Sequence, residues 1–220
     1  MLSSRCGGVA LDEYEEDDDD AVTASERTDA LAMRLGAEAV HDDACMKALA
    51  NELVSGSGRL VSFGIGLGAN SSKPSEHWKI LTNEIASLSE KKRNFQILIG
   101  FLKGLGTPQP ALAASLLDAA VNDEVLGPCF PFLQCGVPIG EAGTKRLRRS
   151  LTLGLAPIEE YRRLAWGRAH ETVSARDLKD LVMAIGNTEG GVGPALEIVF
   201  YRFFGDNQAK KKHEPEIIEA

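Results

Sequence analysis

Glycines that end apolar, helix-periodic stretches are the feature of this chain that most constrains its fold. They occur at Gly68, Gly106, Gly136, Gly167 and Gly205, so that successive glycines lie 38, 30, 31 and 38 residues apart. Each interval has room for one helical hairpin and falls in the range of stacked helical repeats. The sequence therefore predicts an all-α fold, in which helical hairpins stack as a short α-solenoid or as an irregular multihelical array.

The composition favours the same fold class. Hydrophobic residues make up 44% of the 220 residues, which is enough to bury a core, while aromatic residues make up 6%. Plentiful Ala, Leu and Gly suit closely packed helices better than a β-sandwich, which is rich in β-branched and aromatic residues. One domain with flanking tails is the simplest arrangement.

The net charge of −8 comes from one end of the chain. Eight acidic residues lie between Asp12 and Asp20, and the remaining acidic and basic residues balance. Like charges at this density repel one another and bring little apolar surface, so residues 1–24 are predicted to be a disordered acidic arm. Residues 25–205 then form the α-helical repeat-like domain, and residues 206–220 form a polar tail.

Cysteine usage and hydropathy indicate a cellular setting. The four cysteines form no CxxC pair, and no basic segment followed by an apolar one opens the chain. We therefore expect a reducing, cytoplasmic environment. The apolar stretches are interrupted well before the roughly 18 residues that a membrane helix needs, so we expect no membrane partner.

Three predicted helix ends share a pattern in which a glycine-containing stop precedes a proline that opens the next helix. The stops are Gly66-Leu67-Gly68, Gly104-Leu105-Gly106 and Gly154-Leu155-Ala156. Glycine supplies a left-handed C-cap and proline supplies the dihedral angle of a first helical turn. Over about residues 40 to 205 this pattern resembles the HEAT and armadillo class of α-helical repeats, a resemblance of fold.

Motifs that carry chemistry are incomplete in this chain. Gly64 to Ala69 matches GxGxxA, the looser dinucleotide fingerprint, but a loop follows where the fingerprint needs a helix. We interpret these glycines as a helix cap and expect no cofactor. His41 and Cys45 are four residues apart and can face one metal ion, but no further ligand lies at partner spacing, so we expect no metal site. No combination of nucleophile and base indicates an enzyme.

Basic residues gather on two successive predicted helices. They are Lys145, Arg146, Arg148, Arg149, Arg162, Arg163 and Arg168. On adjacent antiparallel helices they would merge into one basic patch, which can bind nucleic acid or another polyanion. Interspersed glutamates, such as Glu159 and Glu160, favour the alternative of a solvated face laced with ion pairs.

The last predicted helix is more apolar than the end of a helical array should be. Its aromatic residues are Phe200, Tyr201, Phe203 and Phe204, and they predict either a contact with a protein partner or ordinary packing on the preceding helix. Together these features predict a non-catalytic protein-interaction or scaffold module. The alternative is a nucleic-acid or polyanion binder that uses the basic patch.

Overall fold

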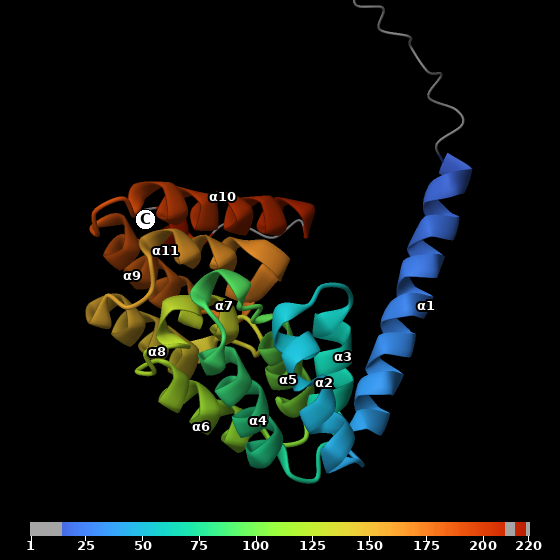
Figure 1. The fold of residues 1–220 in the computed structure, drawn as a ribbon. Coiled ribbons are helices and arrows are strands. Elements are labelled where there is room, and N and C mark those ends of the chain that lie inside the picture. Colours follow the sequence, from blue (N-terminus) through green and yellow to red (C-terminus); the bar gives the residue numbers. More distant parts are fainter. Residues whose placement is uncertain (1–14, 210–213, 219–220) are drawn as a thin grey trace, which may run out of the picture.

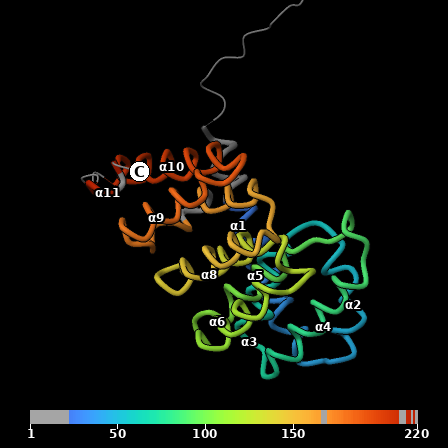
Figure 2. The backbone as a smooth tube through the Cα atoms, turned by 90° about the vertical axis from the view of Figure 1, so that its left-hand side faces the viewer, coloured from blue at the N-terminus to red at the C-terminus, as the bar shows by residue number. Residues whose placement is uncertain are grey.

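The computed structural model describes residues 15–209 and 214–218, and every regular element in this part of the chain is helical, as predicted (Figure 1). The α-helices are α1 (Glu15–Ala39), α2 (Asp43–Ser55), α3 (Leu60–Asn70), α4 (Pro74–Ser87), α5 (Gln96–Leu105), α6 (Pro110–Ala120), α7 (Phe130–Gln134), α8 (Gly140–Leu153), α9 (Ala175–Gly186), α10 (Val192–Gln208) and α11 (Pro215–Ile218). The 3₁₀ helices are η2 (Glu90–Lys92), η3 (Gly127–Cys129) and η4 (Ile158–Thr172). Helices α9 and α10 lie at the end of the molecule opposite α2 and α4 (Figure 2).

Helices α3 and α5 approach each other closely because glycines occupy the contact. Gly64 of α3 faces Gly100 of α5, and a Cβ atom at either position would overlap backbone atoms of the other helix. Gly68 and Gly104, one turn further along each helix, are equally close to the opposing backbone. Small residues four apart on both helices allow this backbone-to-backbone packing.

The opposite face of α3 packs on α1 in the same way. A Cβ atom at Gly66 would overlap the Met33 carbonyl group of α1, and one at Gly36 would overlap the Phe63 carbonyl group of α3. Helix α3 is therefore held between two neighbours, α1 and α5, by glycine contacts on two of its faces.

Three of the five glycines predicted to end helices lie inside helices instead. Gly68 belongs to α3, Gly167 to η4 and Gly205 to α10. At Gly68 the reason is the close approach of α5, so the GxGxxA segment is neither a cap nor a nucleotide loop but the body of α3. Gly106 and Gly136 do lie in the turns that follow α5 and α7.

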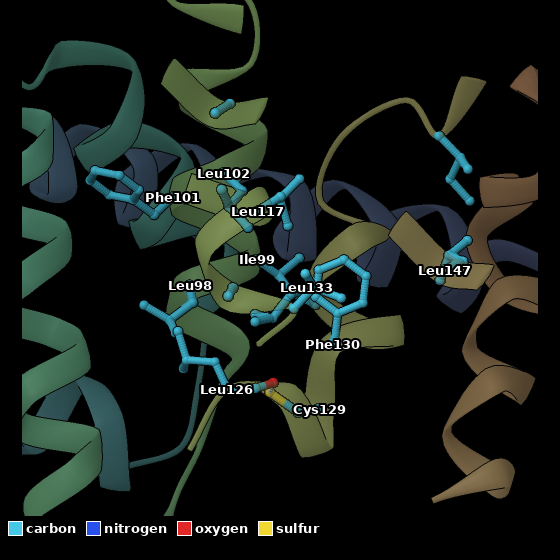
Figure 3. Packing of buried hydrophobic residues seen from close by; sticks show 14 of the residues in the cluster. Leu98, Ile99, Phe101, Leu102, Leu117, Leu126, Cys129, Phe130, Leu133 and Leu147 are labelled. Carbon is cyan, nitrogen blue, oxygen red and sulfur yellow. Dashed lines mark hydrogen bonds between the residues drawn. The ribbon is translucent and has the colours of Figure 1, made fainter. Parts of the chain in front are cut away.

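The hydrophobic core gathers around α5, whose side chains are buried on almost every side. Figure 3 shows Leu98 and Leu102 of α5 near Leu117 of α6 and Phe130 of α7, while Leu147 of α8 belongs to the same core further to the right. A helix that is apolar all round is expected at the centre of a fold.

The predicted helix that follows Pro157 is the 3₁₀ helix η4. Tyr161, Leu164 and His170 are buried and lie at multiples of three residues. A 3₁₀ helix has three residues per turn, so these side chains share one face, which points into the protein.

The structure describes part of each predicted tail. Residues 1–14 of the acidic arm lie outside the described residues, but α1 begins at Glu15, so residues 15–24 are helical. At the other end, α10 extends to Gln208 and Glu214 binds Arg202 at 2.9 Å, while Lys210, Lys211 and Lys212 lie outside the described residues.

Candidate interaction surface

Helix α10 begins after a glycine turn and packs on the rest of the protein along one side. Gly190 adopts a left-handed conformation with φ +76°, and Pro194 lies in the first turn, where its missing N–H group is not needed. Ala195 and Ile198 are buried against α9 and η4, and Phe203 is half-buried on the same core. Phe203 therefore belongs to the packed side, not to the apolar surface predicted from the sequence.

The opposite side of α10 exposes a row of apolar side chains, which we call the α10 ridge: Val192, Leu196, Phe200 and Phe204. Their exposed fractions are 60%, 65%, 62% and 52%, and the neighbouring Tyr201 is 39% exposed. The ridge residues are four apart, so they follow one row along the helix surface. Phe200 stacks on Phe204 with ring centroids 6.5 Å apart and meets Tyr201 edge-on at 5.5 Å.

The charged side chains of α10 engage the protein instead of solvent. Glu197 accepts from Arg162 of η4 at 3.0 Å, and Arg202 contacts Asp206 at 3.5 Å. Between Val192 and Phe204, a stretch that is described in full, no exposed position carries a charged residue. The helix thus reverses the usual distribution, because its ions face inward and its large apolar groups face outward.

A shallow apolar groove of about 190 Å³ runs beside the ridge, between α9 and α10. Val182 and Met183 of α9 line one side, and Val192, Leu196 and Val199 of α10 line the other. Met183 is an exposed, flexible side chain of the kind found at adaptable binding surfaces. The groove extends the apolar surface of α10 onto α9.

The α8 part of the predicted basic patch is largely occupied by ion pairs. Lys145 contacts Glu141 at 2.6 Å, Arg146 contacts Asp118 of α6 at 2.6 Å, and Arg148 contacts an aspartate of α9 at 3.0 Å. Arg149 is exposed and has no ion-pair partner among the described residues. Most of the positive charge of α8 is thus balanced within the protein.

The η4 part of the patch is paired in the same way. Arg162 contacts both Glu159 and Glu197, each at 3.0 Å. Arg163 contacts Glu160 at 3.5 Å and lies over the Phe132 ring, 4.9 Å from its centroid. Arg168 lies in η4, but its side chain is outside the described part. The patch resembles the ion-paired face that the sequence offered as the alternative to a polyanion site.

One chain of polar side chains has the residue types of a hydrolase triad. The Ser71 hydroxyl group lies 2.8 Å from Nδ1 of His77, and Nε2 of His77 lies 3.7 Å from Asp43. Ser71 is only 7% exposed and its oxygen accepts a hydrogen bond from the backbone N–H of Lys73, so a substrate cannot reach it. The cluster fixes the start of α4, and the sequence did not indicate it because Asp43 lies far from the other two residues.

The remaining reactive groups are dispersed or buried. No group of three His, Cys, Asp or Glu residues arranged to hold a metal occurs among the described residues. His41 is exposed and Cys45 is half-buried. Burial raises the pKa of the Cys129 thiol, and it raises that of Cys135 to about 12. Both side chains therefore stay protonated and unreactive at neutral pH.

Comparison of the chain with models of protein families, with curated proteins and with solved structures gave no match. Within the residues that the structure describes, no helix combines the length and the apolar character needed to cross a membrane. The features that bear on function are therefore those of the molecule itself, and the apolar side of α10 has the four most exposed large apolar side chains among the residues described up to Ala209, apart from Leu35 at the same exposed fraction as Phe204.

Proposed function

We propose that this protein is a non-catalytic interaction or scaffold module that binds another polypeptide through the outer side of α10. The observation that carries the proposal is the α10 ridge, in which four large apolar side chains are each more than half exposed. Contiguous apolar surface of this kind, without charge, is typical of protein–protein contacts.

The energetics support a protein partner. Complete burial of a Val, Leu or Phe side chain stabilises a complex by about 1.5–3 kcal/mol, and about half of that remains available at each ridge position. Phe200 lies in the middle of the aromatic cluster and has the properties of an interaction hot spot, since large aromatic anchors at the centre of a contact dominate binding.

Binding of a polyanion by the basic patch is the alternative function. It has less support, because five of the seven basic side chains of the patch already form ion pairs within the protein, from which they would have to be released. A complex of this kind would weaken steeply with salt, whereas an apolar contact would not.

The test is affinity capture from native lysate with the full chain as bait, at low and high salt. Leu196→Glu should abolish recovery of a protein partner, because it places a charge in the ridge. Leu35→Glu is the matched control, since Leu35 is a similarly exposed leucine on α1. Arg149→Glu tests the alternative.

A partner that survives high salt and is lost only with Leu196→Glu would support the proposal. Recovery of nucleic acid that disappears at high salt or with Arg149→Glu would favour the basic patch instead. A partner retained by Leu196→Glu at high salt would contradict the assignment of α10 as the contact surface. Circular dichroism of each variant would establish that it folds.

A further inference from the structure

We infer that a second copy of this chain covers the α10 ridge, with the two α10 helices packed antiparallel about a twofold axis. The inference rests on the proposed function of the outer side of α10 and names its partner. Three properties of the ridge lead to it: the order of its side chains, its lack of charge, and its area.

The ridge side chains increase in size along the helix, from Val192 through Leu196 to Phe200 and Phe204. In an antiparallel pair whose twofold axis crosses the ridge midway between Leu196 and Phe200, all four ridge residues are covered: Val192 of one copy faces Phe204 of the other, and Leu196 faces Phe200. Each contact then joins a smaller side chain to a larger one, which fills the interface evenly. A parallel pair would place the phenylalanines against each other and leave a gap at Val192.

The twofold arrangement also explains why the ridge carries no charge. In such a pair the same patch is present on both sides, so any charged residue near the axis would face its own copy. The charged side chains of α10 avoid this, because Glu197 and Arg202 are directed to Arg162 and Asp206 within the same chain. A charged partner would find no complementary charge along the ridge to recognise.

The area is sufficient for a dimer of moderate affinity. Taking roughly 200 Å² for a whole aromatic side chain and somewhat less for Val and Leu, the ridge and Tyr201 expose roughly 500 Å² per copy. Two copies would bury roughly 1,000 Å² in total, which is the lower limit for a specific interface. We therefore expect a reversible dimer that forms as the protein concentration rises.

Sedimentation velocity of the full chain, from about 1 to about 200 µM, measures this equilibrium. We expect a monomer at the low end and a dimer at the high end. Leu196→Lys and Phe200→Glu should each raise the dissociation constant by more than about tenfold, because each places two unpaired charges in the interface. Leu35→Glu should leave it unchanged.

Mixing the variants tests the antiparallel register. In a dimer of Leu196→Lys with Phe200→Glu, the new lysine faces the new glutamate, and the other central contact keeps its native Leu196 and Phe200. The mixture should therefore dimerise more strongly than either variant alone, which also shows that both variants are folded. Val192→Lys mixed with Phe200→Glu is the control, because position 192 faces position 204 and no such pair forms.

Two results would overturn the inference. One is a chain that stays monomeric at about 200 µM; if Leu196→Glu still abolishes capture of another protein, the proposed function stands without the dimer. The other is a dimer that persists in Leu196→Lys and Phe200→Glu. Equal recovery of the Val192→Lys and Leu196→Lys mixtures would contradict the antiparallel register. A ridge-dependent dimer with no other partner in lysate would support the dimer and limit the module to self-association.

Discussion

The close approach of α3 and α5 makes a prediction in which the same substitution has opposite effects at two sites. Gly100→Ala adds a Cβ atom that would overlap the Val61 carbonyl group and lie 3.0 Å from Cα of Gly64. All of these atoms belong to the backbone, so no side chain can move aside, and the two helices have to separate. Gly205→Ala, inside α10, adds a Cβ atom whose nearest neighbour is the Glu171 carboxylate at 3.5 Å, an ordinary contact.

The magnitudes follow from two opposing effects. Alanine is more favourable than glycine in a helix by about 0.8–1.0 kcal/mol, and this gain applies at both sites. Overpacking costs about 1–3 kcal/mol, and the cost applies only at Gly100, where the overlap with rigid backbone places it in the upper part of that range. We expect Gly100→Ala to lower the free energy of unfolding by about 1–2 kcal/mol. Gly205→Ala should raise it by about 0.5–1 kcal/mol.

Urea denaturation followed by far-ultraviolet circular dichroism measures both changes. An equal dependence of the free energy of unfolding on urea concentration in the wild type and the variants would indicate that two-state unfolding is preserved. A double variant with Gly64→Ala should lose less than the sum of the single losses, because helices already separated at Gly100 leave room at Gly64. Stabilisation by Gly100→Ala equal to that by Gly205→Ala would show that the backbones of α3 and α5 do not touch, and would refute the reasoning.

Two further predictions concern buried titratable groups. Burial raises the pKa of Tyr161 to about 12, above its ordinary 10.0, so the phenol ionises first in the unfolded chain as the pH rises. Its contribution to the free energy of unfolding should be intact below pH 10 and disappear between pH 10 and 12. Tyr161→Phe should remove this loss when unfolding is measured across that pH range. Loss of solvation also raises the pKa of the Cys129 and Cys135 thiols, so neither should react with iodoacetamide at pH 8 until the chain is unfolded. Mass spectrometry of native and denatured samples measures the labelling, and rapid labelling of Cys129, which is buried, in the native protein would contradict this reasoning.

Much of the fold could be predicted from the sequence because helical periodicity is a local signal. The all-α class and the glycine C-cap after α8, where Gly154 has φ +64°, follow from residues a few positions apart. Glycine was misleading at Gly68, because glycine serves both as a helix end and as a position that another backbone approaches. At Gly205 no backbone approaches, and the glycine lies within α10. Only the tertiary structure shows which role each glycine has.

In the candidate surfaces, too, contacts within one helix could be predicted from the sequence and contacts between helices could not. The glutamates near Arg162 and Arg163 could be recognised from the sequence, because they lie three residues away on the same helix. The contacts of Arg146 with Asp118 and of Arg148 with Asp180 join different helices, and no local pattern indicates them. The sequence likewise showed that α10 is apolar, but it did not show which of its side chains pack on the rest of the protein.

The reversed polarity of α10 is difficult to explain by stability alone. A helix at the end of a monomer gains most when its apolar side chains are buried and its ions are solvated. Helix α10 instead exposes Leu196 and Phe200, while the side chain of Arg202 is only 12% exposed. Ion pairs removed from water contribute little net stability, and exposed phenylalanine contributes almost none. Exposure of Leu196 and Phe200 becomes favourable only when another apolar surface covers the ridge, and this is the role that we propose for a second copy of the chain.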